Sequence, residues 1–246
     1  MTVDGSRYRW KTPGGLGKAL QVLLVAAGIL GLLIAVVLAI GFSRRSLVFH
    51  VPGPNDPAGT VVFPSDMRWF GLLWVPSLIS QATVVIWLIW QHQATANLWA
   101  RGLRDLRTSP GWAVGWWFVP FAWYVMPFLA VREIDVRSSP DGAPRRASPL
   151  LGWWWAAWIG AQAGPLIGMF GFAFPAMFRW AQTIQNGATS VDLAPFFRPL
   201  LPWVVLGGVL QAMAGIFAWQ VVARIDSSQS AMAAAPAIPP RPDRAF

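Results

Sequence analysis

Five long runs of the sequence lack acidic and basic side chains, apart from Lys18 near the start of the first, and they limit the fold more than any other feature. The runs cover residues 16–42, 69–91, 111–131, 150–178 and 200–223. About 20 apolar residues are enough to cross the hydrocarbon core of a bilayer as a helix. The sequence therefore predicts an all-α integral membrane protein, a helical bundle built from five hydrophobic segments.

The composition supports this class. Hydrophobic residues make up 55% of the 246 residues and charged residues only 12%, and the mean hydropathy is +0.48. Such values are typical of a multi-pass membrane protein. We expect one membrane domain at 16–223. A basic cytoplasmic tail at 1–15 precedes it, and an Ala/Pro-rich tail at 224–246, expected to be disordered, follows it.

The third segment, 111–131, differs from an ordinary membrane helix. The stretch SPGWAVGWWFVPFAWYVMPF, residues 109–128, spreads Trp and Tyr through its middle, although these side chains prefer the two membrane interfaces. Pro120 and Pro127 disfavour helical geometry at the residues that precede them. Broken backbone at membrane depth needs neighbouring protein or water to satisfy it. We therefore predict a kinked, re-entrant or interfacial third segment.

The distribution of Lys and Arg points the same way. If all five segments cross the membrane, the two sides carry 9 and 10 basic residues; if the third segment starts and ends on one face, they carry 14 and 5. Only the second arrangement has the excess of positive charge that cytoplasmic loops usually show. We predict four full spans plus the third segment, with both termini in the cytoplasm. Five full spans are the alternative.

Residues 94–108, between the second and third segments, have a basic amphipathic helical pattern. Arg101, Arg104 and Arg107 fall on one side of a helix, opposite an apolar side. One interpretation is that this stretch only extends the second helix into water. The other is a helix in the membrane interface whose arginines bind anionic headgroups.

Residues able to perform chemistry are scarce. The interiors of the five segments contain no Asp, Glu, Arg or His, whereas intramembrane proteases, proton-coupled carriers and buried metal sites need ionisable groups at depth. His50 and His92 have no partner at a metal-binding spacing, and the chain has no Cys. We expect no enzyme activity, cofactor or metal. The net charge of +9 is scattered over loops beside the membrane, so we expect lipid headgroups rather than nucleic acid as its partner.

Two sets of residues remain as candidates for helix contacts. Gly160, Gly164 and Gly168 recur every four residues, which places small residues on one helix face. They indicate close packing within the bundle or a contact between copies of the chain, or only the high frequency of Gly in membrane helices. One amide lies near the middle of each of three spans: Gln81, Gln162 and Gln211. These amides either bond across helices or line a path for a solute.

The stretch NLWARGLRDLRTSPGWAVGWWFVPFAWYVMPFLAVREI, followed by PLLGWWWAAW at 149–158, resembles a bacterial membrane-protein family known as domain of unknown function 4328. The most specific positions are Ser109, Pro110, Gly111, Trp112, Gly115, Trp116, Trp117, Pro120 and Pro127. The resemblance implies a multi-span helical protein of a bacterial cytoplasmic membrane and supplies no activity, substrate or catalytic residue.

Two functions are compatible with these features. The first is a non-enzymatic interaction or assembly component of the cytoplasmic membrane, which contacts anionic headgroups and either another membrane protein or a second copy of itself. The alternative is a transporter or channel-like protein for a small neutral or lipid-like solute.

Overall fold

The computed structural model describes residues 8–12, 14–43, 48–50, 60–62, 74–103, 105–141, 143–188, 190–192 and 197–235. The chain divides into two compact units. Unit 1 contains residues up to 25, residues 80–155 and residues from 215 onward, whereas unit 2 contains residues 26–79 and 156–214. Arg104, residues 69–73 and residues 236–246, on which several predictions fall, lie outside the described part of the chain.

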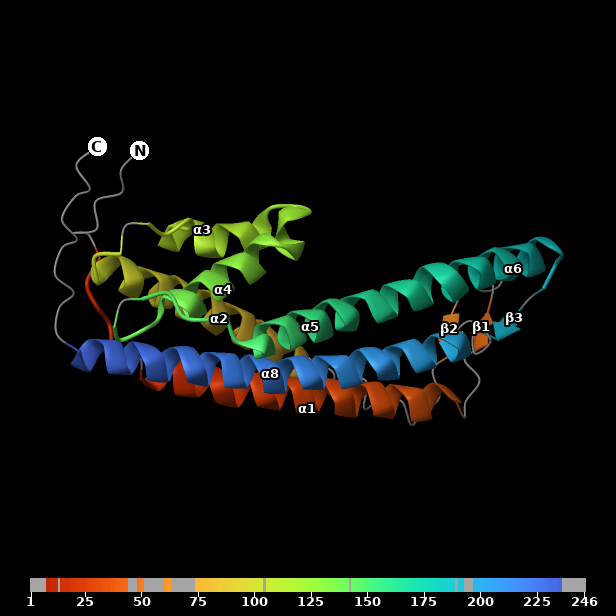
Figure 1. Cartoon of the computed structure of the whole chain (residues 1–246). Coiled ribbons are helices and arrows are strands. Elements are labelled where there is room, and N and C mark those ends of the chain that lie inside the picture. Colours follow the sequence, from red (N-terminus) through yellow and green to blue (C-terminus); the bar gives the residue numbers. More distant parts are fainter. Residues whose placement is uncertain are drawn as a thin grey trace. The chain divides into compact units, whose positions relative to one another are not determined.

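Helices make up most of the described chain (Figure 1). The α-helices are α1 (Gly15–Ser43), α2 (Trp74–Ala100), α3 (Pro110–Gly115), α4 (Met126–Arg137), α5 (Pro149–Gly168), α6 (Phe174–Gln185) and α8 (Leu201–Ala234). Single 3-10 turns cover Trp116–Phe118, Ala122–Tyr124 and Arg198–Leu200, and the π-helical turn Met169–Ala173 joins α5 to α6. The helical class predicted from the apolar runs is confirmed, with one small sheet as an addition.

Within the described residues, three helical stretches are long and apolar enough to cross a membrane on their own. They are Gly15–Gly41, Pro149–Gln185 and Arg198–Ala234. A fourth crossing would be present if the bent pair Pro110–Phe118 and Ala122–Arg137 formed one span. The predicted segment 69–91 starts outside the described residues, so α2 represents only part of it. The described residues therefore contain three to four candidate spans, and the expected count of five segments is not confirmed.

The third segment is bent, as predicted. Its two helical parts, Pro110–Phe118 and Ala122–Arg137, meet at an angle of 113°. At the bend Phe121 has a φ of 64°, a left-handed conformation that is unfavourable for a bulky side chain. Pro120 precedes this residue, and Pro127 lies in the first turn of the next helix, where a missing N–H costs nothing. The prolines therefore end and restart the helix around one strained residue.

The predicted amphipathic helix at 94–108 is not a single helix. The part up to Ala100 continues α2, and the chain then leaves helical geometry. Gly102, with a φ of 87°, donates its N–H to Trp99 O at 3.0 Å, and Leu103 N–H bonds Leu98 O at 3.3 Å. This pair of bonds is the Schellman ending of a helix, which needs a residue that adopts positive φ. The glycine inside the amphipathic pattern is therefore a stop signal.

The expectation of a disordered tail from residue 224 is wrong for residues 224–234, because α8 continues without a break to Ala234. Its buried positions beyond the apolar run follow a helical spacing: Val222, Ile225, Gln229 and Met232 are each at most 1% exposed. Residues 224–234 are thus held in place by side chains that pack in unit 1. At 1.5 Å per residue, the 34 residues of α8 extend about 51 Å, well beyond a hydrocarbon core of about 30 Å.

The hairpin region after the first segment forms short strands. β1 (Val48–His50) pairs antiparallel with β2 (Thr60–Val62). On its other edge β1 pairs antiparallel with β3 (Ser190–Asp192), so the sheet order is β2-β1-β3. The third strand was not predicted, because only its pairing partner distinguishes this short segment from a loop.

Close helix packing in unit 2 depends on glycines of α8. A Cβ atom added at Gly207 would lie 3.1 Å from Cγ of Pro165 on α5, and one added at Gly208 would lie 2.6 Å from Cβ of Ala35 on α1. Two adjacent glycines thus let α8 approach a different helix on each of two faces. Gly28 of α1 takes part as well, since its added Cβ would lie 3.1 Å from Cα of Ala212.

Candidate functional site

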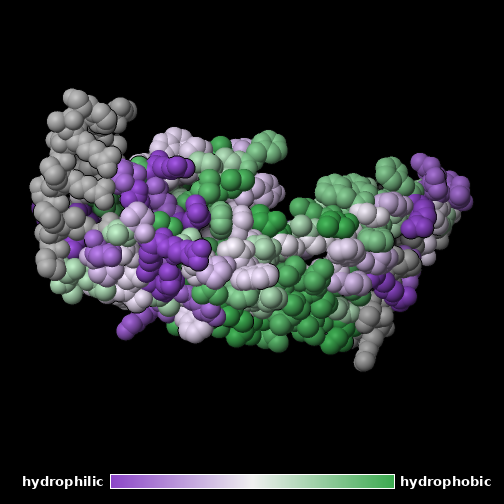
Figure 2. Space-filling model, in the orientation of Figure 1, coloured by the Kyte–Doolittle hydropathy of each residue, from purple (hydrophilic) through white to green (hydrophobic). Residues whose placement is uncertain are grey.

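In unit 1 polar side chains of α2, α8 and the stretch before α5 meet near the start of α1. Trp90 of α2 donates its indole N–H to Asp226 of α8 at 2.9 Å, and a Cβ added at Gly17 of α1 would overlap the same carboxylate. Arg145, just before α5, donates to Ser228 of α8 at 2.6 Å. Figure 2 shows hydrophilic residues gathered over this end of α8 and over α2 and α4. These contacts define a polar layer at one end of the unit.

The first cluster in this layer joins the N-terminal tail to two helices. The side-chain amide of Asn97, only 1% exposed, accepts from the backbone N–H of Lys11 and donates to its carbonyl, both at 2.9 Å. The same amide nitrogen donates to Oε1 of Gln229 at 2.8 Å. Gln229 in turn donates to Ala94 O and to the Ser138 hydroxyl, at 2.9 and 3.3 Å. One Asn and one Gln therefore connect the tail, α2, α4 and α8.

The second cluster surrounds Asp135 of α4, which is 1% exposed. Its Oδ1 accepts from Arg145 Nη2 at 2.7 Å and from Arg224 Nε at 2.9 Å, and Oδ2 accepts the backbone N–H of Ser148 at 2.8 Å. Arg145 also donates through Nε to the Asp135 carbonyl at 2.8 Å. A buried carboxylate needs such compensation to remain charged. The cluster attaches the start of α5 and the end of α8 to α4.

A third polar group supports the bent segment. Oε1 of Gln91, a fully buried residue of α2, accepts from the indole N–H groups of Trp87 and Trp117, at 3.1 and 2.9 Å. Its Nε2 donates to Ala113 O at 3.0 Å. Trp87 also packs against Trp154, with ring centroids 5.1 Å apart. Trp117 of the bent segment is thus attached to α2 through the Gln91 amide.

Glu133 joins the two ends of the third segment. Its carboxylate accepts the backbone N–H groups of Arg107 at 2.7 Å and Thr108 at 3.1 Å, immediately before α3. Arg137, one turn further along α4, forms an ion pair with Asp105 at 2.6 Å. The chain therefore enters this segment and leaves it at the same end of unit 1.

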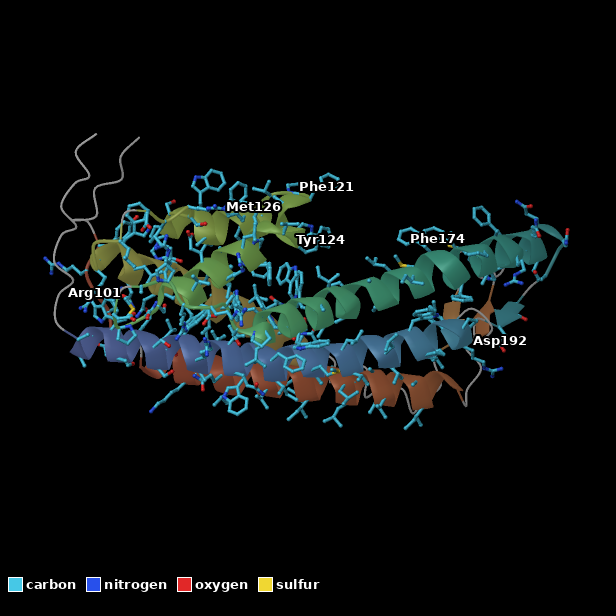
Figure 3. The ribbon with its side chains drawn as sticks, viewed as in Figure 1. Arg101, Phe121, Tyr124, Met126, Phe174 and Asp192 are labelled. Atoms are coloured by element: carbon cyan, nitrogen blue, oxygen red, sulfur yellow. The ribbon has the colours of Figure 1, made fainter. Side chains whose placement is uncertain are left out.

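The opposite end of the third segment is an apolar tip. We define the aromatic tip as residues 118–125, in which Phe118 is 73% exposed and Phe121 86% exposed. Figure 3 shows Phe121 and Tyr124 together at the bend, far from Arg101 at the other end of the unit. No residue of the tip is charged. A strained φ at Phe121 keeps a large apolar side chain fully outward, which is typical of a contact surface.

The polar layer leaves little internal space. Its cavity, lined by residues that include Gly17, Asn97, Asp226 and Gln229, has a volume of about 10 Å³, enough for one water molecule. Among the described residues, no group of three or more His, Cys, Asp or Glu side chains could hold a metal ion. What the layer does chemically is satisfy buried polar groups and fix five chain segments to one another.

The predicted headgroup-binding arginines are placed separately. Arg101 donates from Nη2 to Ala235 O at 3.0 Å, at the end of α8. The side chain of Arg107 is exposed, while its backbone N–H bonds Glu133. The structure therefore gives Arg101 a role in capping a helix and does not gather it with Arg107 on one helical face.

The predicted packing glycines all face α8 in unit 2. Added Cβ atoms at Gly160 and Gly168 would lie 2.9 Å from Leu210 and 3.0 Å from Trp203, and one at Gly164 would lie 3.4 Å from Trp203 O. Gln211 of α8 is half-buried and packs near Gly31 of α1, with 3.7 Å from an added Cβ to its Cγ.

The other two predicted amides, Gln81 and Gln162, have exposed side chains. Gln81 belongs to unit 1 and Gln162 to unit 2, and Gln162 lies on the side of α5 that faces away from the packed glycines. The structure thus brings the glycines together on one contact and does not bring the three amides together within either unit.

The motif residues build the start and the bend of the third segment. Ser109 caps α3 by accepting the N–H of Trp112 at 3.4 Å, and Pro110 is the first helical residue. Trp112 packs against Trp116 in a tilted arrangement, with ring centroids 4.7 Å apart. Gly115 lies against the ring of Trp112, with 3.2 Å from an added Cβ to Cε3, so a larger residue would crowd that ring.

Residues 55–227 match the family described as Domain of unknown function (DUF4328). The chain belongs to this family. No curated protein and no solved structure matches the chain. Family membership supplies no activity, so the role of this member has to be argued from its own residues.

The polar residues that organise unit 1 were missed in the sequence. Asn97 lies in the predicted amphipathic helix at 94–108, Asp135 lies after the third apolar run, and Gln229 lies in the stretch predicted as a disordered tail. A signal was present: Val222, Ile225, Gln229 and Met232 continue a helical face past the end of the apolar run. For Asp135 and Glu133 nothing in the sequence alone indicates the distant partners.

Proposed function

We propose that this protein is a non-enzymatic interaction or assembly component of a cytoplasmic membrane, and that the aromatic tip is its contact surface. The observation that carries the proposal is that the two ends of the third segment are joined by hydrogen bonds while the aromatic tip between them is exposed. Glu133 holds its two ends together at the polar layer, while Phe118 and Phe121 project without a polar partner. An exposed apolar cluster held in strained backbone fits a surface meant for another molecule.

The proposal includes a topology. The third segment enters and leaves the membrane on the cytoplasmic face, the termini lie on that face, and the tip lies inside the bilayer. The polar layer and the bond from Glu133 to Thr108 support this arrangement. So does the 14 to 5 distribution of basic residues. A tip at this depth meets either lipid chains or the apolar side of another membrane protein.

Site-specific photo-crosslinking tests the proposal. A photoreactive phenylalanine analogue replaces Phe121 in the full-length protein, and native membranes are irradiated. We expect discrete protein adducts, whereas the same analogue at Ile29, an exposed apolar position of α1, gives mainly lipid adducts. A pattern at position 121 that contains only lipid adducts would contradict an assembly role for the tip.

One observation favours the transport of a lipid-like solute as a second candidate. An open apolar groove of about 860 Å³ in unit 2 is lined by α1 and the start of α8, with Arg198 at its edge. Its size and lining suit an acyl chain, and the arginine suits a headgroup. Replacing Val205 and Val209 by Trp fills the groove, so lipid transfer between vesicles by the reconstituted protein would fall only under this second function.

A further inference from the structure

Two arginines of unit 1 share one carboxylate, which leaves an excess positive charge. Arg145 Nη2 and Arg224 Nε both donate to the same oxygen of Asp135, at 2.7 and 2.9 Å. Asp135 is 1% exposed, while the Arg224 side chain is 39% exposed. One negative and two positive charges therefore meet at a position that solvent or lipid can reach. The three groups together carry a net charge of +1.

The other carboxylates nearby are engaged elsewhere. Asp105 pairs with Arg137, and Glu133 accepts two backbone N–H groups. Asp226 is two residues along α8 from Arg224, on the opposite side of the helix, and bonds Trp90. Ser228, one turn along on the same side as Arg224, supplies a hydroxyl to Arg145 and no charge. The excess charge is thus not neutralised by these acidic side chains of the unit.

Arg224 retains donors that Asp135 does not use. Its Nε bonds Asp135, and among the described residues no partner is seen for Nη1 and Nη2. The bond to the buried carboxylate holds the guanidinium in place, so its remaining donors are already oriented before any ligand arrives. A planar pair of N–H donors on a fixed arginine matches the oxygens of a phosphate group.

The position of the cluster is that of a membrane boundary. The apolar run of α8 ends at residue 223, one residue before Arg224, and the apolar run of α5 starts at 150, shortly after Arg145. About one turn deeper, Trp153 of α5 and Trp219 of α8 are 64% and 41% exposed. Exposed tryptophans mark the interfacial zone of a bilayer. Arg224 therefore lies at the level of the lipid phosphates.

We propose that Arg224, positioned by Asp135 and backed by Arg145, binds the phosphate of an anionic phospholipid headgroup. The site is separate from the predicted basic stretch at 94–108 and from the aromatic tip, and it does not depend on the assembly role of the protein. Exposed Arg146, next to Arg145, adds a further positive charge to the same loop. The shared chemistry is a phosphate anion, and its source is the lipid of the cytoplasmic leaflet.

Native mass spectrometry of the delipidated full-length protein tests the site. The protein in detergent is titrated with phosphatidylglycerol and with phosphatidylcholine, and the bound fraction is measured for each lipid. We expect wild type to prefer phosphatidylglycerol, and Arg224→Gln to lose about tenfold of that preference. Arg132→Gln, which removes an exposed arginine of α4 in the same unit, should keep the wild-type preference and controls for net charge.

Two further arms complete the test. Arg224→Lys keeps the charge, but a single ammonium group cannot bind Asp135 and a phosphate as well as a guanidinium does. The preference of this variant for phosphatidylglycerol should therefore fall at least threefold. Arg224→Lys takes the place of Arg224→Gln if the latter does not fold in detergent. Inorganic phosphate at millimolar concentration should leave lipid binding intact. Wild-type preference in the position-224 variants would overturn the proposal, as would complete displacement of phosphatidylglycerol by inorganic phosphate, which indicates a site for soluble anions.

Discussion

Asn97 is the residue on which most connections of the polar layer converge. Its amide makes a two-bond pair with the backbone of Lys11 and a third bond to Gln229, and it is almost completely buried. Each of these bonds replaces a bond to water, so each adds only a modest net stability. Loss of the amide has a larger effect, because it leaves buried groups without partners.

We therefore expect Asn97→Ala to lower the free energy of unfolding by about 2 to 3 kcal/mol. The loss of order should include the N-terminal tail, since the amide is bonded to Lys11 on both sides. Thermal unfolding in detergent, followed by tryptophan fluorescence, measures the first effect, and proteolysis near Lys11 measures the second. His92→Ala, at an exposed position of the same helix, is the matched control. Equal stability of the two variants would argue against a central role for Asn97.

Glu133 illustrates how one side chain can determine the path of a segment. Its carboxylate accepts the backbone N–H groups of Arg107 and Thr108, which lie before the capping residue of α3 and so outside the hydrogen-bond pattern of the helix. Glu133→Ala should destabilise the fold by about 1 to 2 kcal/mol, because charge-assisted bonds at a half-exposed site are partly screened. Hydrogen exchange at residues 107 and 108 should become faster. Arg132→Ala, next to it and exposed, should leave this exchange unchanged. Unaltered exchange in the Glu133 variant would mean that the two ends are held together by other contacts.

At the scale of elements, the apolar runs predicted α1, α5 and α8 because a membrane helix needs only length and the absence of charge. At the start of α3, Ser109 is the capping residue and Pro110 the first helical residue, which are the residue types that favour these positions. The prediction of one helix at 94–108 was wrong, because Gly102 adopts a positive φ and ends α2. The amphipathic pattern of these residues does not show this local stop. Residues 224–234 were misjudged because their stability comes from tertiary burial of Ile225 and Gln229.

The contact between α5 and α8 allows a direct test of an element pair. Gly164→Leu should destabilise unit 2 by about 1 to 3 kcal/mol, since the larger side chain meets the backbone of Trp203 and has to push the helices apart. Gly152→Leu places the same side chain on the same helix where no atom lies within 4 Å of an added Cβ, so it should have little effect. Thermal unfolding of both variants in one detergent provides the comparison. A Gly164 variant as stable as the Gly152 variant would show that this glycine face is not a packing constraint.

At the scale of the whole molecule, membrane topology depends on the third segment. Its sequence predicted a bend through two prolines. The bonds that join its ends, however, run from the N–H groups of Arg107 and Thr108 to Glu133, which lies 26 and 25 residues further along the chain. Such long-range partners could not be read from local composition. The distribution of 14 basic residues on one side and 5 on the other is the sequence feature that indicates the topology, because it combines the charges of all loops.

The topology can be tested with single cysteines, since the natural chain contains none. Arg107→Cys, Ala143→Cys, Asn186→Cys and Ser230→Cys place one thiol each at exposed positions before the third segment, after it, after α6 and near the end of α8. Intact cells are labelled with a membrane-impermeant maleimide, and a second sample is opened before labelling. Reaction of every thiol in the opened cells shows that each position is chemically accessible.

The re-entrant arrangement requires positions 107, 143 and 230 to behave alike and position 186 to behave differently. With cytoplasmic termini, only Asn186→Cys should label in intact cells. A third segment that crosses fully would move residue 143 to the other side from residue 107, so positions 107 and 186 would form one group and positions 143 and 230 the other. The decision rests on the grouping rather than on the absolute side, so it holds even if the orientation of the termini is reversed. Grouping of 107 with 186 would place the ends joined by Glu133 on opposite faces, which the two bonds to residues 107 and 108 do not allow without a change in structure.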